Sequence, residues 1–202
     1  MNLPPNEIVA LLIAVSFAAG LNVYATVATL GLLGHFHVIA LPASLHLLTG
    51  WPIIVASAAL FGVEFFADKI PAFDLIWNAL HTFIRVPVAA VLAYQAASSL
   101  SPGEQLLAAL AGGLIAFIAH GGKTAVRAAV TPSPEPVSNI TLSLGEDALA
   151  IVLTWMAAWK PYIAAAIATV LAIVVLLMIR LVWRALKALF GGAERQVNRA
   201  AR

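Results

Sequence analysis

Long stretches of apolar residues recur along almost the whole chain, and they constrain its fold more than any other feature. The run WPIIVASAALFGV, which begins at Trp51, and the segment 163–179 contain no charged residue. Of the 202 residues 62% are hydrophobic and only 10% are charged, whereas soluble domains carry about 25% charged residues. Because so little polar surface could not cover a globule in water, the sequence predicts an integral membrane protein.

Six segments are long and apolar enough for a helical crossing, which needs about 20 residues. They cover approximately residues 6–35, 52–70, 72–98, 104–127, 138–159 and 161–190. The first is too long for one perpendicular helix and contains AAGLN at 18–22, so we expect it to be broken or re-entrant. We predict an all-α transmembrane bundle of about six spans, with a single domain over 1–190 and a basic tail over 191–202.

Positively charged residues indicate the orientation of this bundle. If the N-terminus lies inside, the inner side receives Lys69, Lys123, Arg127 and the tail, whereas the outer side receives only Lys160. Cytoplasmic segments of membrane proteins carry an excess of lysine and arginine. We therefore expect both termini in the cytoplasm.

Two pairs of similar segments raise the question of an internal repeat. ASAALFGVEFFADKIP is similar to LAGGLIAFIAHGGKTA, and SFAAGLN is weakly similar to SLGED. Inverted repeats are common in transporters, but spans rich in alanine, glycine and leucine also match one another by chance. Both interpretations stay open at the level of the sequence.

Polar residues follow one face of five of the six segments. In the third segment the members of this stripe are 4, 3 and 4 residues apart, which places them on one helix face: Asp74, Asn78, His81 and Arg85. The other stripes are Asn22, Thr26 and Thr29; Ser57, Glu64 and Asp68; His120, Lys123 and Arg127; and Ser143, Asp147 and Thr154, with Glu146 beside the last. Because polar faces in lipid must meet one another or water, we expect a polar central cavity, with the sixth segment as a lipid-facing scaffold.

The ionisable members of these stripes, together with Asn22, are the candidate binding residues. Those expected near mid-depth are Asn22, Glu64, Arg85, Glu146 and Asp147, and those expected closer to the inner side are Asp68, His120, Lys123 and Arg127. A charge at the bilayer centre costs about 2.5–3.5 kcal/mol, so these groups need partners or water. Two interpretations remain: a hydrated site for an ion or polar solute, and an ion-pair network that only fixes the helix register.

Individual residues suit different roles. Glu64 and the pair Glu146–Asp147 suit proton or cation binding, because a desolvated carboxylate can exchange a proton near neutrality; permanent pairing with Arg85 and Lys123 is the alternative. The planar fork of Arg85 suits an anion or a carboxylate. Asn22 indicates an unwound segment that lines a site.

Other chemistries have little support in the sequence. The histidines show no HxxxH or HExxH spacing, and no GxSxG, P-loop or GxGxxG motif is present, so we expect no metal, no cofactor and no enzymatic activity. Basic residues concentrate in the last 23 positions, where anionic lipid headgroups are the expected partners and nucleic acid is not. A homo-oligomer stays open.

Three blocks of the sequence resemble one membrane-protein family. They are SFAAGLNVYATVATLGLLG, EFFADKIPAFDLIWNALHTFIRVPVAAVLA and HGGKTAVRAAVTPSPEPVSNITLSLGEDALA. Together, over about residues 8–160, they are similar to the bacterial integral-membrane family called domain of unknown function 4126. The resemblance implies a small multi-pass protein of a bacterial inner membrane and covers the same polar stripes, but it implies no activity.

These observations favour a small transporter or channel-like protein that holds an ion or a small polar solute at mid-membrane. Protonation of one carboxylate would couple to the movement. One alternative is a lipid-handling protein in which Arg85, Lys123 and Arg127 bind a phosphate headgroup from the inner leaflet. The other is a scaffold that transports nothing.

Overall fold

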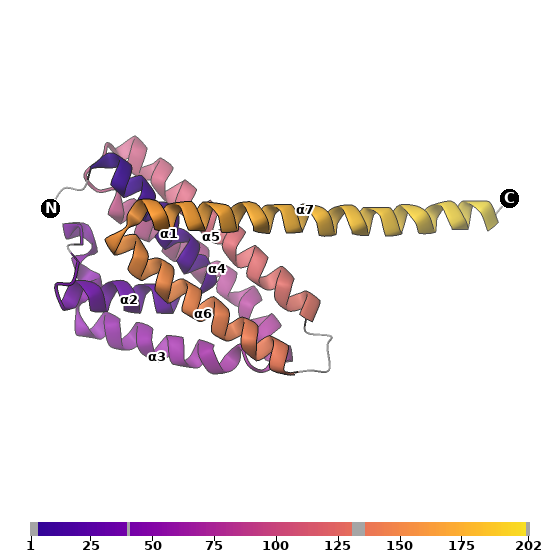
Figure 1. Ribbon diagram of the computed structural model, residues 1–202, viewed down its shortest axis with the longest axis horizontal. Coiled ribbons are helices and arrows are strands. Elements are labelled where there is room, and N and C mark those ends of the chain that lie inside the picture. The colour runs from indigo at the N-terminus through magenta and orange to yellow at the C-terminus, as the bar shows by residue number, and fades with distance from the viewer. Residues whose placement is uncertain (1–3, 40, 131–135, 201–202) are drawn as a thin grey trace.

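The described part of the chain is helical throughout and contains no strand (Figure 1). A computed structural model describes residues 4–39, 41–130 and 136–200, and their side chains except at 71–75, 128–130, 136, 138–139, 185–186 and 188–200. The elements are α1 (Pro5–Leu21), α2 (Val23–His35), the 3-10 helix η1 (Ala43–Thr49), α3 (Trp51–Ala67), α4 (Pro71–Ala96), α5 (Pro102–Val130), α6 (Pro136–Trp159) and α7 (Pro161–Ala200). The predicted all-α class is confirmed.

Prolines account for most of the helix starts. The helices α1, α4, α5, α6 and α7 each begin with a proline, and Pro52 is the second residue of α3. A helix leaves its first N–H groups without intrahelical partners, so the missing N–H of proline costs nothing there.

Membrane crossing is supported for four single helices and for one bent pair. The four are α4, α5, α6 and α7, and the pair is η1 with α3, which bend by 64° at the break between them. The described residues therefore supply four or five candidate spans, and the expected number of about six is not confirmed.

The remaining apolar segment consists of α1 and α2, which are separated at Asn22. The backbone of Asn22 is extended, with φ −151° and ψ 103°, and this ends α1. Its side-chain oxygen accepts a hydrogen bond of 2.9 Å from the backbone N–H of Ala25, which caps the start of α2. The break expected within AAGLN is confirmed.

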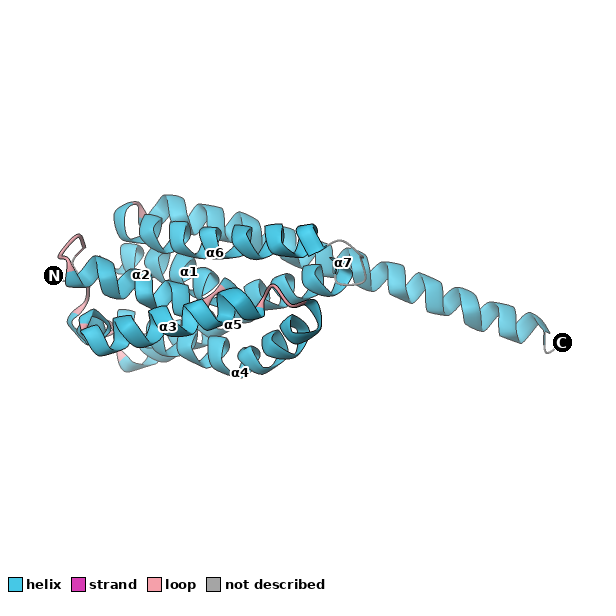
Figure 2. Cartoon of the chain, turned by 90° about the horizontal axis from the view of Figure 1, so that it is seen from below, coloured by secondary structure: helices cyan, strands magenta, loops and turns pink. Residues whose placement is uncertain are grey.

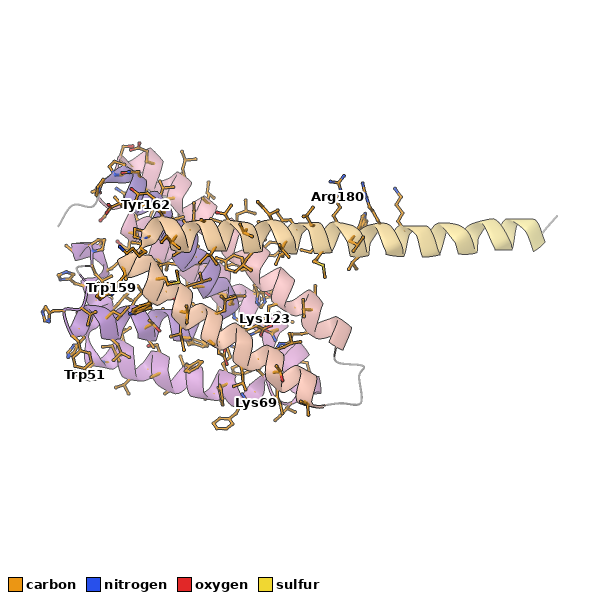
Figure 3. The ribbon with its side chains drawn as sticks, in the orientation of Figure 1. Trp51, Lys69, Lys123, Trp159, Tyr162 and Arg180 are labelled. Atoms are coloured by element: carbon orange, nitrogen blue, oxygen red, sulfur yellow. The ribbon has the colours of Figure 1, made fainter. Side chains whose placement is uncertain are left out.

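The two halves form a hairpin whose ends return to one end of the bundle (Figure 1). At the start of α1, the amide of Asn6 donates to the hydroxyl of Tyr162 at 2.7 Å. At the end of α2, the ring of His35 lies 4.6 Å from the ring of Trp51. Trp51 and Tyr162 lie at the same end of the molecule (Figure 3), so the α1–α2 hairpin enters the bundle and returns without crossing it.

The hairpin changes the expected topology. Because α3 to α7 then alternate in direction, the start of α1 and the end of α7 lie at opposite ends of the bundle (Figures 1 and 2). The expectation that both termini share one side does not fit this arrangement, because it treated residues 6–35 as a full crossing. α3 and α5 run in the same direction, so the similar segments within them are not related by inversion.

The core of the bundle forms around the short helix α1. Phe17 and Leu21 pack against Ala119 of α5, Leu153 of α6 and Ala168 of α7. These partners are mostly small, which lets the backbones of membrane helices approach closely. α1 therefore holds the candidate spans together, although its 17 residues are fewer than the roughly 20 that a crossing needs.

α7 indicates where the membrane boundaries lie. Tyr162 and Trp183 are 51% and 69% exposed, and about 32 Å of helix separates them at a rise of about 1.5 Å per residue. Aromatic residues of this kind mark the two interfaces of a hydrocarbon layer about 30 Å thick. Beyond Trp183, α7 extends past the other helices (Figure 2).

The hairpin predicts which sites face which side of the membrane. The chain contains no cysteine, so single cysteines can be introduced at the exposed positions Pro4, Ser99 and Lys187. We expect a membrane-impermeant thiol reagent to label Pro4→Cys and Ser99→Cys from one side of oriented vesicles, and Lys187→Cys from the other. Labelling of Pro4→Cys and Lys187→Cys from the same side would contradict the hairpin.

Close packing at Gly20 predicts a loss of stability in one glycine variant. A Cβ on Gly20 would lie 2.5 Å from the backbone oxygen of Ala116, and overpacking of this kind costs about 1–3 kcal/mol. We expect Gly20→Ala to lower the thermal unfolding temperature in detergent. Gly62→Ala is the control, because a Cβ there meets nothing within 4 Å; equal unfolding temperatures for the two variants would argue against this packing.

Candidate functional site

Charged side chains from α3, α4, α5 and α6 meet inside the bundle, beside the tip of the α1–α2 hairpin. Figure 3 shows Lys123 among these helices, away from the end that carries Trp51 and Tyr162. We call the group the charged cluster; its members are Glu64, Asp68, Arg85, His120, Lys123, Arg127, Glu146 and Asp147. Ion pairs join six of them, and of these six only Glu146 has any exposed side-chain surface, at 13%.

The first pair of the cluster joins α3 to α4. Nη2 of Arg85 donates to Oε1 of Glu64, and both side chains are fully buried. Nη1 of Arg85 donates to the backbone oxygen of Leu21 at 2.9 Å and to Nδ1 of His120 at 2.9 Å. One guanidinium thus connects four elements, which its planar set of donors makes possible.

Lys123 is shared among several acceptors. Its Nζ lies 2.8 Å from Oδ2 of Asp68, 3.5 Å from Oε1 of Glu64 and 3.6 Å from Oε2 of Glu146. It also donates to the backbone oxygen of Leu21 at 3.3 Å. Because an ammonium is a compact charge on a flexible stem, Lys123 can shift between these acceptors without any helix moving.

Arg127 closes the cluster at the end of α3. Its Nη2 lies 2.5 Å from Oε2 of Glu146 and 3.1 Å from Oδ2 of Asp68, and its Nη1 donates to the backbone oxygen of Asp68 at 3.0 Å. Asp68 is the residue at which α3 ends. A cation at this position stabilises the negative end of the helix dipole as well as the two carboxylates.

The tip of the hairpin contributes backbone groups to the cluster. α1 ends at Leu21, whose carbonyl faces Arg85 and Lys123, so two cations meet the negative end of this helix. On the other side of the break, the amide of Asn22 donates to Oδ1 of Asp147 at 2.8 Å. The C-terminal end of α1 and the N-terminal end of α2 are therefore bonded to polar groups rather than exposed to lipid.

Hydrogen bonding fixes which nitrogen of His120 carries a proton. Nδ1 of His120 must accept from Arg85, so Nε2 carries the proton and donates to Thr82 at 2.8 Å. Nδ1 of His81 donates to the backbone oxygen of Trp77 at 2.8 Å, and its Nε2 lies 3.2 Å from the hydroxyl of Tyr24. His81 therefore contacts α2, and among the described residues the ion pair of its neighbour Arg85 is with Glu64.

The cluster lies between the levels of the two exposed aromatic residues of α7. A Cβ on Gly122 would lie 2.6 Å from Cγ1 of Val175, so the neighbouring Lys123 is level with Val175 of α7. That level is about 20 Å along α7 from Tyr162 and about 12 Å from Trp183. Lys123 is thus nearer to the level of Trp183, toward the end with the basic residues.

Most of the sequence-predicted site residues come together here. The predicted residues from Asn22 to Asp147 join the cluster or border it, whereas the side chain of Asp74 lies outside the described residues. The arginine and lysine chains of the cluster reach across to the carboxylates directly. A cavity of about 700 Å³ lies at the N-terminal end of the bundle, lined by Glu7, Leu11, residues 38, 39, 41 and 42, and residues 157–163.

Sequence reasoning missed the backbone acceptors of Gly20 and Leu21 and the side chains of Tyr24 and Thr82. The carbonyls could have been inferred from the break itself, since every helix ends with unpaired carbonyl groups. Thr82 follows Asn78 by one helical turn and so extends the polar stripe of α4. For Tyr24 the sequence offers no signal, because its contact depends on the direction in which α2 leaves the break.

Comparison with known proteins supports the resemblance found in the sequence. The family model described as "Domain of unknown function (DUF4126)" matches residues 9–184, which contain every member of the charged cluster. No curated protein and no solved structure matches the chain.

The Glu64–Arg85 pair predicts a coupled effect on stability. Removing one partner of a buried ion pair leaves an uncompensated charge and costs about 3–5 kcal/mol. We therefore expect Arg85→Gln to lower the free energy of unfolding in detergent more than the double variant Glu64→Gln/Arg85→Gln does. As a control, Glu104→Gln alters an exposed hydrogen bond to Ser101 and should have little effect on the free energy of unfolding. If the loss in the double variant equals the sum of the losses in Glu64→Gln and Arg85→Gln, the pairing is contradicted.

Proposed function

The chain belongs to the family described as domain of unknown function (DUF4126), and we propose that it is a small transporter or channel-like protein of a bacterial inner membrane. Its site is the charged cluster, where an ion or a small polar solute is held beside Asn22 at the tip of the hairpin. The observation that carries this proposal is that α1 ends inside the bundle at Leu21, with its carbonyl bonded to the buried cations Arg85 and Lys123.

The energetics of the cluster support a working site over a purely structural one. A charge inside the hydrocarbon region costs about 2.5–3.5 kcal/mol, and packed apolar residues often stabilise a fold as well as a buried ion pair does. Broken helices with free terminal carbonyls are a recurring feature of transporter binding sites. A short hairpin that ends at Asn22 supplies this arrangement at the level of Arg85 and Lys123.

The position of the cavity supports a path that leads to the cluster. The cavity at the N-terminal end contains Glu7 and Leu11 of α1, and α1 continues from there to Leu21 at the cluster. Toward the other end of the bundle, Asp68 and Arg127 join α3 to α5. The ion pairs therefore stand between the cavity and the opposite side, as a closed gate would.

The positive charges support one orientation for this path. Lys69 and Arg180 lie toward the end of the bundle opposite Trp159 (Figure 3), which directly precedes Lys160, and the basic tail follows Arg180 in the sequence. By the positive-inside rule that end faces the cytoplasm. The C-terminus is then cytoplasmic, and the N-terminus and the cavity face the other side.

The lipid-handling alternative has less support. Arg85, Lys123 and Arg127 would have to bind a phosphate, but each is at most 3% exposed and already contacts a carboxylate. A headgroup could reach them only after those pairs had broken.

Tracer flux into proteoliposomes tests the proposal. We expect the protein to move at least one of Na⁺, K⁺, methylammonium, chloride, phosphate and glycine faster than empty liposomes do. The flux should be lost in Glu64→Gln/Arg85→Gln and in Asp147→Asn, and retained in Arg180→Gln, which alters α7 outside the cluster. If none of these probes moves faster than in empty liposomes, the proposal is overturned. In that case scrambling of a fluorescent phospholipid by the protein would favour the lipid alternative, and no scrambling would favour the scaffold. Unchanged flux in the cluster variants would overturn the site.

A further inference from the structure

The charges of the cluster do not balance among the buried side chains that the structure describes. Ion pairs join three cations to three carboxylates: Arg85, Lys123 and Arg127 to Glu64, Asp68 and Glu146. Asp147 is 4% exposed, and none of these pairs includes it. It is therefore the buried carboxylate in excess.

Asp147 has one bonded oxygen and one without a partner. Its Oδ1 accepts from the amide of Asn22, while its Oδ2 has no hydrogen-bond partner among the described residues. The hydroxyl of Ser143, one turn earlier on α6 and fully buried, also has none. Two polar groups on the same face of α6 are thus available to a ligand next to the hairpin tip.

Charged groups of both signs surround Asp147. The charges that face it are Lys123 from α5 and Asp68 and Glu64 from α3, with Lys69 at the end of α3 also within electrostatic range. The other elements packed against α6 are α1, α2 and α7. Their titratable groups up to the level of the cluster are Glu7, Tyr24, His35 and Tyr162, and only Tyr24 lies near the hairpin tip.

Lys123 cannot neutralise Asp147 while it serves the other carboxylates. Its ammonium already has three carboxylate neighbours within 3.6 Å. An uncompensated carboxylate in a medium of low dielectric constant binds a proton instead of remaining charged.

A proton fits the available atoms better than a metal cation does. Hard cations take about six or more oxygen ligands, whereas the described residues offer two unpartnered oxygens on α6 here. A proton needs one acceptor. We infer that Asp147, one helical turn after Ser143 on α6, holds an exchangeable proton on Oδ2 and, resting on the proposed function, that this proton is the coupling ion.

Release of the proton links Asp147 to the gate. The O–H bond breaks, both electrons stay on Oδ2, and the proton passes to a water molecule. The resulting carboxylate attracts the ammonium of Lys123, which then leaves Asp68 and Glu146. Proton uptake reverses these changes and restores the closed ion pairs.

Infrared spectroscopy of the protein in lipid tests the proton site without any transport assay. At neutral pH we expect a carbonyl stretch of a protonated carboxylic acid that shifts in D₂O. The band should be lost in Asp147→Asn, shifted but present in Asp147→Glu, and unchanged in Glu104→Gln, which alters an exposed residue. Absence of the band in the wild type, or its persistence in Asp147→Asn, would overturn the inference and leave the proposed function intact.

The coupling is tested separately by flux at several pH values. We expect the flux of the transported probe to depend on pH in the wild type, and both the flux and this dependence to be lost in Asp147→Asn and to return in Asp147→Glu. If the infrared band behaves as expected but Asp147→Asn retains a pH-dependent flux, the coupling is overturned. If the band behaves as expected and no probe moves in the wild type, the proposed function is overturned, while the proton site stands.

Discussion

The hydrogen bonds from Arg85 and Lys123 to the carbonyl of Leu21 are the interaction on which the rest of the structure depends. A helix that ends inside a membrane leaves carbonyl groups that lipid cannot satisfy. The two cations satisfy them, but each cation then needs an anion of its own. The requirement for Glu64 and Asp68, and through them for Arg127 and Glu146, follows from this first contact.

The same contact explains why the cluster can be both stable and exchangeable. Arg85 is fixed, because its guanidinium is bonded to a carboxylate, a carbonyl and a histidine ring at once. Lys123 is not fixed in this way, because it shares one ammonium among several acceptors. A change in charge at Asp147 therefore acts first on Lys123, while Arg85 keeps the hairpin tip in place.

The sequence predicted the members of the site better than it predicted their partners. Spacings of three and four residues showed that Glu64 and Asp68 share a face, as do Lys123 and Arg127, because helical periodicity is a local property. The break near Asn22 was also predictable from the length of the first segment and its AAGLN motif. In contrast, the return of α2 to its starting side depends on packing against α3 and η1, which no local pattern encodes. The isolation of Asp147 from the ion pairs could not be foreseen for the same reason, since it depends on which helices become neighbours.

The central contact can be measured directly by solid-state NMR. Leu21–Asn22 is the only Leu–Asn pair in the chain, so ¹³C-carbonyl leucine with ¹⁵N-asparagine selects the Leu21 carbonyl, and ¹⁵N-guanidinium arginine supplies the second label. Nη1 of Arg85 lies 2.9 Å from the Leu21 oxygen. We therefore predict that the arginine nitrogens dephase the signal of the Leu21 carbonyl carbon in a frequency-selective dipolar experiment on the wild type, and that this dephasing is lost in Arg85→Gln. A Leu21 carbonyl that is not dephased in the folded wild-type protein would contradict the account.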